Sequence, residues 1–171
     1  ATQHLLDLGH RRLAYLGHDN RFDVPCRSAR YRGFMDTCEQ ADIAVPPAWQ
    51  IAANADNYVA ILEKILTDQP RPTGFVTFSD LWAVRLIKEV LKYGLKIPDD
   101  ISVVGFDNSE LSQNYDIPFT TVHPEFEAIA EAVVDLLIAK IEAAKAMPKR
   151  NILITPRLIV RHSTASPRGI S

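Results

Sequence analysis

Two polar residues, Ser79 and Asp107, each follow a short apolar run of the sequence. The run before Ser79 reads Gly-Phe-Val-Thr-Phe, and the run before Asp107 reads Ile-Ser-Val-Val-Gly-Phe. Runs of this kind are typical of buried strands in a parallel sheet, and ligands bind such sheets at the carboxyl ends of the strands. We therefore predict that both side chains open into one pocket, where the carboxylate accepts hydrogen bonds from a polar ligand.

Other kinds of site leave little trace in the sequence. The five histidines and the two cysteines, Cys26 and Cys38, lack metal-ligand spacing, and there is no Gly-x-Ser-x-Gly, Walker-type or Gly-x-Gly-x-x-Gly motif. An aspartate at a strand end could be catalytic, but no partner base or nucleophile stands near Asp107 in the sequence. We expect no enzyme, cofactor or metal. Two thiols fit a reducing cytoplasm, and a bridge between them is left open.

The elements that position these residues alternate along the chain. Apolar periodicity predicts helices over 2–8, 27–40, 57–67, 79–93, 111–115 and 124–146, and strands over 13–16, 49–52, 74–78, 101–107, 119–122, 151–155 and 157–162. Ser79 is a suitable N-cap for its helix. The alternation predicts an α/β fold, with right-handed crossovers and an open parallel sheet flanked by helices. We expect the tail after Ser163 to be loose.

Composition limits the partners of this segment. A chain of 171 residues suffices for one domain with a substantial core. Its net charge of −2 argues against binding to the phosphates of nucleic acid. No apolar run approaches the roughly 20 residues of a membrane span. The first ten residues have neither an initiator Met nor the pattern of a signal peptide. We therefore expect a segment from within a larger, cytoplasmic protein that has no contact with a membrane.

Six stretches, in order along nearly the whole chain, carry a family resemblance: His4–Gly17, Arg30–Phe34, Arg71–Asp80, Gly94–Asp107, Pro118–Val122 and Pro156–Thr164. Together they resemble the effector-binding part of the lactose/galactose repressor (LacI/GalR) family of bacterial transcription regulators. The resemblance implies a two-lobed, periplasmic-binding-protein-like core, preceded by a helix-turn-helix headpiece and a hinge. We expect residues 1–122 to form the C-terminal lobe, 123–155 to return to a mostly absent first lobe, and 156–171 to be the final strand and tail.

The resemblance also implies binding residues. Asp107 matches an aspartate that accepts hydrogen bonds from effector hydroxyl or ring N–H groups, with capping of the next short helix as the alternative. Arg30 matches the arginine of an Arg-x-x-Gly-Phe pattern that reaches the effector, and a solvent-facing arginine is the alternative. Ser79 stands where relatives often have Asn or Gly, although capping alone would explain it. Phe126 resembles an aromatic residue packed on the ligand, with core packing as the alternative, and Cys26 falls near a further pocket position.

The function implied is that of a ligand-sensing module. A small polar effector, a sugar or a related metabolite, would bind between two lobes and change the operator binding of headpieces absent from this chain. We expect a homodimer face on helices 80–93 and 111–115. We also expect the apolar face of helix 124–146 to be covered by another copy, or the helix to be displaced. The alternative function is a sugar-binding receptor of a transport system, although the tail over 157–164 favours a regulator.

Overall fold

One six-stranded sheet organises the protein. The structure is a computed structural model, and it describes residues 1–18, 25–143 and 150–168. The strand order is β2-β1-β3-β4-β5-β6, with the strands β1 (Leu13–His18), β2 (Gln50–Ala53), β3 (Gly74–Thr77), β4 (Ser102–Phe106), β5 (Thr120–His123) and β6 (Arg157–Ile159). Neighbours among β1 to β5 pair in parallel, whereas β6 pairs with β5 in the antiparallel sense. The predicted α/β fold with an open, mostly parallel sheet is confirmed.

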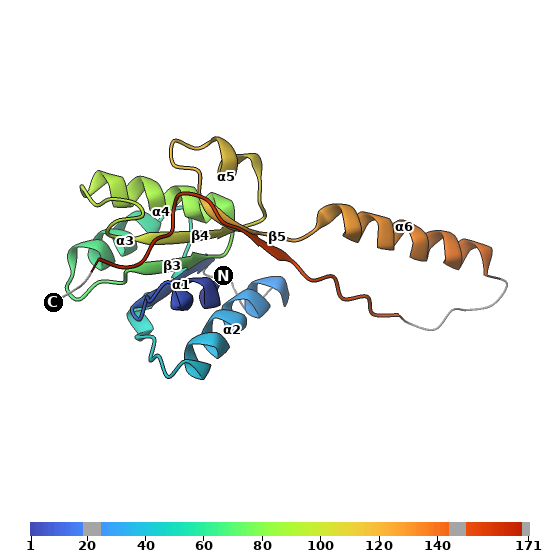
Figure 1. Ribbon diagram of the computed structural model, residues 1–171, viewed down its shortest axis with the longest axis horizontal. Helices are drawn as coiled ribbons and strands as arrows, with labels where there is room; N and C mark the ends of the chain where they lie inside the picture. Colours follow the sequence, from blue (N-terminus) through green and yellow to red (C-terminus); the bar gives the residue numbers. More distant parts are fainter. Residues whose placement is uncertain (19–24, 144–149, 169–171) are drawn as a thin grey trace.

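Helices cover both faces of this sheet (Figure 1). One face carries α1 (Thr2–Asp7) and α2 (Pro25–Gln40), and the other carries α3 (Tyr58–Thr67) and α4 (Asp80–Lys92). A 3-10 turn, η1 (Pro47–Trp49), leads into β2, and the short helix α5 (Glu110–Asn114) follows β4. The helices α1 to α5 begin within two residues of their predicted starts, and the apolar spacing that predicts them is clearest in α3 and α4.

The core forms two layers, one on each side of the sheet. Successive side chains of a strand point to opposite faces, so in β1 Leu13 and Tyr15 join the layer under α1 and α2. Ala14 and Leu16 join the layer under α3 and α4. Burial on both faces explains why the central strands read as continuous apolar runs instead of alternating ones.

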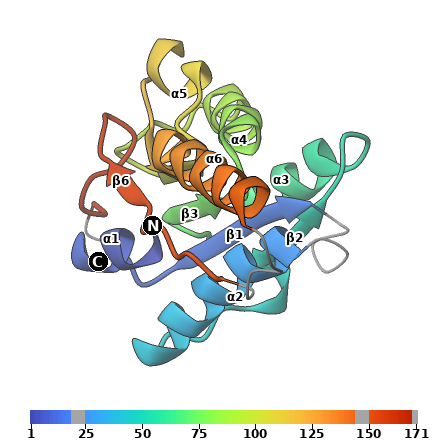
Figure 2. The ribbon, with the colours of Figure 1, turned by 90° about the vertical axis from the view of Figure 1, so that its right-hand side faces the viewer.

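Helix α6 (Phe126–Glu142) extends away from the sheet (Figures 1 and 2). None of its residues is buried, and its large apolar side chains other than Leu136 are between 38% (Ile129) and 74% (Ile141) exposed. Exposed apolar area of this kind normally marks a surface that meets a partner. The helix ends at Glu142, before the predicted 146, and residues 144–149 lie outside the described part of the chain.

Two predicted strands near the C-terminus are wrong in extent. Residues 151–155 form no strand, and Leu153 is 95% exposed, because no other strand in the described part of the chain lies beside them. The strand predicted over 157–162 ends at Ile159. Beyond it the chain turns to cross the amino ends of β4 and β5, where its hydrogen bonds go to Val103 and Pro118 instead of to a strand ladder.

The tail after Ser163 is fixed, so the prediction of a loose tail is wrong at least as far as Arg168. Ser163 is fully buried, and its Oγ donates to the Val103 carbonyl at 2.6 Å and accepts from the Thr120 N–H at 2.8 Å. The Arg168 guanidinium pairs with the Asp99 carboxylate at 2.6 Å. A tail tied to two strands by a buried hydroxyl cannot fray independently of the sheet.

A buried histidine completes the attachment of the tail. His10 is 1% exposed, and its Nε2 lies 2.9 Å from the Ala165 carbonyl and 3.0 Å from the Ser102 Oγ, while its Nδ1 lies 2.9 Å from the Thr73 Oγ1. A carbonyl only accepts, so Nε2 carries the proton and Nδ1 accepts from the threonine. Burial lowers the pKa of His10, which keeps this imidazole neutral.

Candidate functional site

The carboxyl ends of β3 and β4 lie side by side, because the two strands pair in parallel. Ser79 and Asp107 follow these strands, as the sequence predicted. Arg30 lies on α2, and its side chain contacts a residue that follows each strand, Phe78 after β3 and Asp107 after β4. We call the cluster of Arg30, Phe78, Phe106 and Asp107 the strand-end site.

Arg30 is held firmly in this cluster. Its Nη1 donates to the Phe78 carbonyl at 2.6 Å, and its Nη2 lies 3.4 Å from the Asp107 Oδ1. The guanidinium carbon lies 3.6 Å from the centre of the Phe106 ring and 4.7 Å from that of Phe78. Two aromatic faces and a carbonyl fix the orientation of a planar cation, and its side chain is only 22% exposed. The alternative of a solvent-facing arginine is wrong.

Asp107 keeps an accessible carboxylate beside this cation. Its side chain is 35% exposed, and its contact with Arg30 is long for a hydrogen bond. Burial raises the pKa of the Asp107 carboxyl, Arg30 lowers it, and the nearby Asp80 raises it again, with a net upward shift. Its capping alternative is wrong, because Ser109 is the N-cap residue of α5. The carboxylate therefore has acceptor capacity that the fold leaves partly unused.

The other predicted site residues lie outside the strand-end site, on α4, α2 and α6. Ser79 is partly buried at the N-cap position of α4, as predicted, but its side chain makes no capping hydrogen bond. Cys26 is a free, exposed thiol one turn before Arg30 on α2, so the bridge to Cys38 is not formed. Phe126 is 51% exposed in the described part of the chain, and its ring lies edge-to-face with that of His123, with the two ring centres 5.9 Å apart.

Sequence reasoning missed several polar residues behind the site. Asp80 is 1% exposed and accepts hydrogen bonds from Ser109 and Thr121, and Arg161 donates to Asn108. In the sequence Asp80 reads as an ordinary acidic residue in the first turn of a helix, and its partners lie 29 and 41 positions away. Its place directly after Ser79 at a strand end is the one local signal that could have singled it out.

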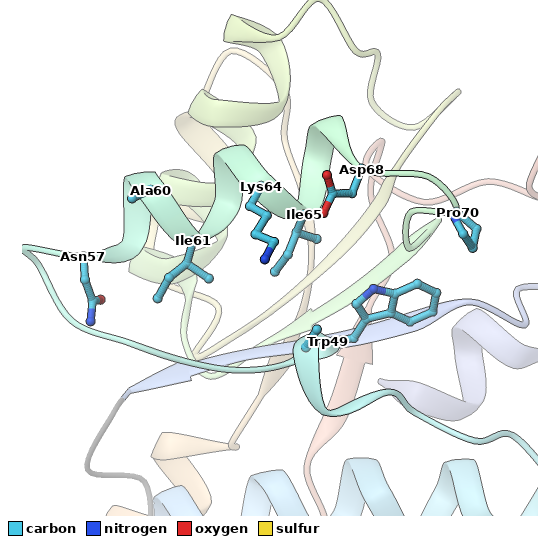
Figure 3. A pocket seen from close by; sticks show the side chains of 9 residues that line it. Trp49, Asn57, Ala60, Ile61, Lys64, Ile65, Asp68 and Pro70 are labelled. Carbon is cyan, nitrogen blue, oxygen red and sulfur yellow. The ribbon is translucent and has the colours of Figure 1, made fainter.

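Two cavities lie close to the sheet. One of about 290 Å³ is bordered by Arg30 and Phe106 on one side and by Tyr15, Phe34 and Val76 on another, so it adjoins the strand-end site. A second, of about 420 Å³, lies between η1 and α3 (Figure 3), and its walls are Ala48, Trp49, Asn57, Ala60, Ile61, Lys64, Ile65, Asp68 and Pro70. It shares no residue with the strand-end site, and is therefore a separate surface feature.

The chemistry available at the strand-end site is recognition. A fixed guanidinium and a partly exposed carboxylate, flanked by aromatic rings, can hold hydroxyl or amide groups. Within the described residues, no group of three histidine, cysteine or acidic side chains could hold a metal ion. In the same part of the chain, no helix is long and apolar enough to cross a membrane.

Comparisons with known proteins place this geometry in a family. The periplasmic binding protein-like domain family matches residues 2–164. The HTH-type transcriptional repressor PurR of Vibrio vulnificus is 34% identical over 164 residues, which cover 94% of this chain and 48% of that repressor. The chain thus spans about half the length of the curated relatives it matches.

Solved structures agree with this match. A complex of the transcriptional regulator CelR with cellobiose is 25% identical, with a TM-score of 0.83 over 95% of this chain and 50% of that one. A LacI-family regulator from Mycobacterium smegmatis is 29% identical, with a TM-score of 0.82 over 98% of this chain and 62% of that one. The dimeric Lac repressor is 26% identical, with a TM-score of 0.79 over 98% of this chain and 60% of that one. The chain belongs to the periplasmic binding protein-like domain family and corresponds to the C-terminal, effector-binding region of LacI-family regulators.

Proposed function

We propose that this chain is the ligand-sensing module of a DNA-binding transcriptional regulator, and that it binds a sugar or a related small polar metabolite at the strand-end site. The observation that carries the proposal is the fixed Arg30 beside Asp107, whose side chain is about one-third exposed. Neighbouring hydroxyl groups of a sugar can donate to the carboxylate and accept from the guanidinium at the same time. The structural neighbour that is described as a cellobiose complex supports this ligand class. Ser79, Cys26 and Phe126 are proposed as further effector contacts.

The exposed face of α6 supports a second lobe outside this chain. We propose that residues 1–122 form one lobe, that 123–155 pack on the second lobe, and that 156–171 return to the first. An effector bound between the lobes would favour one of their relative orientations, and a headpiece elsewhere in the protein would bind operator DNA accordingly. The effector acts as a switch only if it binds one orientation more tightly than the other.

The relatives and the surface support three further parts of the proposal. The matched relatives are repressors, and we propose that this module likewise senses its ligand without chemical turnover. Leu81 on α4 and Leu111 on α5 are 50% and 43% exposed, and we propose that this surface forms a homodimer, the state named for the Lac repressor structure. A repressor acts where the chromosome is, so we propose a cytoplasmic protein.

A ligand screen on the full-length protein tests the proposal. Sugars, sugar phosphates and nucleobases are compared by thermal shift, because a ligand at 100 times its Kd stabilises the folded state by about 2.7 kcal/mol. Calorimetry then measures the affinity of each active compound for the wild type and for Asp107→Asn. We expect at least about a tenfold loss, since a hydrogen bond to a charged acceptor contributes about 1.5 to 3 kcal/mol.

The matched control is Asp99→Asn, which removes a carboxylate paired with Arg168 at the other end of the sheet. We expect this variant to bind as tightly as the wild type. Equal affinity of all three proteins for every active compound would place the effector elsewhere and overturn the proposed site. An electrophoretic shift assay with genomic fragments then asks whether an active compound changes DNA binding, as the proposed regulator requires.

A further inference from the structure

The turn that follows β4 has an unusual backbone. Asp107 has a φ of 112° and Asn108 a φ of 51°, so two successive residues with side chains lie in the region that favours glycine. Such a conformation persists only where the surrounding structure imposes it. The direction of the Asp107 carboxylate therefore depends on whatever holds this turn.

One end of the turn is anchored by Asp80, at the start of α4. The buried carboxylate accepts from the Ser109 N–H at 2.7 Å, from the Ser109 Oγ at 2.8 Å and from the Thr121 Oγ1 at 2.6 Å. Gly105 makes room for it, because a Cβ at that position would lie 2.4 Å from the Asp80 Oδ1. The anchor thus fixes residue 109 and leaves the two residues before it to be held from elsewhere.

Arg161 holds the middle of the turn. Its Nη2 donates to the Asn108 Oδ1 at 2.7 Å, and its Nη1 donates to the Ser112 Oγ at 3.1 Å and to the Phe119 carbonyl at 3.2 Å. The same guanidinium therefore spans the turn, α5 and the approach to β5. The Asn108 backbone N–H is also occupied, because it donates to the Thr121 Oγ1 at 3.3 Å.

We propose that Arg161 is a positioning residue, which holds Asn108 in its left-handed conformation and thereby directs Asp107 toward the effector. The inference rests on the proposed function, since it takes Asp107 as an effector contact. Arg161 itself makes no contact with the strand-end site among the hydrogen bonds of the described residues, and it acts through Asn108. It lies two residues beyond β6, so the segment that returns after α6 controls the presentation of the binding carboxylate.

The alternative is that Arg161 merely adds stability. The two roles differ in what happens to Asp107 when the arginine is replaced in a protein that remains folded. Loss of a nearby positive charge alone would raise the pKa of the Asp107 carboxyl. Relaxation of the turn would expose the carboxylate to water, which lowers that pKa, and would move it away from Arg30, which raises it. Asn108→Gly therefore separates the two roles, because it can restore the conformation of the turn but not the charge of Arg161.

The test follows the titration of Asp107 by NMR in the full-length protein carrying aspartate labelled with 13C at Cγ. Loss of the signal in Asp107→Asn assigns it. In Arg161→Met we expect the midpoint to move by about half a pH unit or more, because both the burial of the carboxylate and its contact with Arg30 would change. Adding Asn108→Gly to Arg161→Met should restore the midpoint, because glycine adopts the left-handed conformation without support.

The control is Arg168→Met, which removes a guanidinium from the opposite end of the sheet and should leave the midpoint unchanged. An unchanged midpoint in Arg161→Met overturns the inference, and so does a failure of Asn108→Gly to restore it. These results need no effector, so they stand apart from the proposed function. If Arg161→Met shifts the midpoint, Asn108→Gly restores it and Asp107→Asn leaves all ligand affinities intact, positioning holds and the proposed site fails.

Discussion

His10, Ser102 and Ser163 form a buried, hydrogen-bonded cluster at the amino end of the sheet, whereas Asp107 in the strand-end site, at the carboxyl end, is partly exposed and makes a long contact with Arg30. His10, Ser102 and Ser163 are at most 1% exposed, and each bonds to the returning tail or to a strand that the tail crosses. Asp107 is 35% exposed, has a long contact with Arg30 and sits on a left-handed backbone. The same strands β3 and β4 run between these two environments.

The difference separates stability from binding. A buried donor or acceptor that loses its partner is costly, so the amino end contributes to the free energy of unfolding. A carboxylate that is one-third exposed and has a raised pKa contributes little to stability, yet it can gain hydrogen bonds when a ligand replaces water. Substitutions in the buried cluster at the amino end should therefore destabilise the fold without changing ligand affinity, and substitutions of Asp107 should do the reverse.

The largest decrease in the free energy of unfolding is expected for His10→Ala. The substitution leaves the Thr73 and Ser102 hydroxyls and the Ala165 carbonyl without their imidazole partner, and it opens a cavity in a buried site. Unpaired buried groups and cavities each cost about 1 to 3 kcal/mol, so we expect the free energy of unfolding to fall by about 3 kcal/mol. Urea denaturation followed by tryptophan fluorescence measures it.

The matched control is His162→Ala, because the side chain of His162 is exposed. Exposed substitutions usually change stability by less than about 0.5 kcal/mol, and we expect the same here. A loss below about 1 kcal/mol in His10→Ala would mean that the tail contributes little, and the contrast between the two ends of the sheet would be broken.

A smaller decrease in the free energy of unfolding is expected when the pH falls. Burial is the main cause that lowers the pKa of His10, and it also lowers the pKa of His4, whose Nε2 lies 3.0 Å from the Thr164 Oγ1. A histidine in the unfolded chain has a pKa of about 6.5, so below this pH the unfolded chain binds protons that the folded chain does not bind. The contribution of the two neutral histidines to stability is therefore complete only above this pH. It should be lost progressively as the pH falls from about 6.5 through the lowered pKa values.

Urea midpoints at pH 7.5 and 5.5 measure this loss. We expect the wild type to lose more stability than His10→Ala over this interval, because the variant lacks one of the two groups that bind protons on unfolding. Equal losses in the two proteins would show that His10 is protonated as readily in the fold as in the unfolded chain. The tail would then not shield it from water.

Much of the fold could be predicted because it depends on local patterns. Apolar runs bounded by turn residues marked β3 and β4, and Gly9 and Gly94, both with positive φ, marked helix ends. The pairing of residues 151–155 could not be predicted correctly, because a β-rich pattern forms a strand only beside another strand. The same limit explains why β6 is shorter than its apolar sequence suggested.

The candidate site was predictable where a residue follows its own strand and unpredictable where it acts across the fold. Asp107 and Ser79 were found from their positions at strand ends. Asp80 and Arg161 were missed, because burial and hydrogen bonding to partners 29 to 53 residues away decide their roles. A sequence pattern shows which residue types are present, but it does not show which donors a buried carboxylate meets.

The smallest effect on stability is expected for Asp107→Asn, and it sharpens the comparison most. The fold disfavours the ionised carboxylate, as its raised pKa shows, so a neutral amide of the same shape removes that cost and loses the attraction of Arg30. The removed cost and the lost attraction change the free energy of unfolding in opposite directions. Because the Asp107 side chain is about one-third exposed, solvent screening reduces both. We expect the free energy of unfolding at pH 7 to change by less than about 0.5 kcal/mol. Asp80→Asn, at the same end of the sheet, is the control.

The buried Asp80 carboxylate accepts two hydrogen bonds from the partly buried Ser109 and one from the buried Thr121, so its amide variant must turn an N–H group toward at least one of these donors. That mismatch should cost about 2 kcal/mol by urea denaturation, although the substitution is chemically the same. If Asp107→Asn were instead as destabilising as Asp80→Asn, Asp107 would belong to the structural network behind the turn. Its carboxylate would then be needed to maintain the fold, and the strand-end site would lose the acceptor that it offers to a ligand.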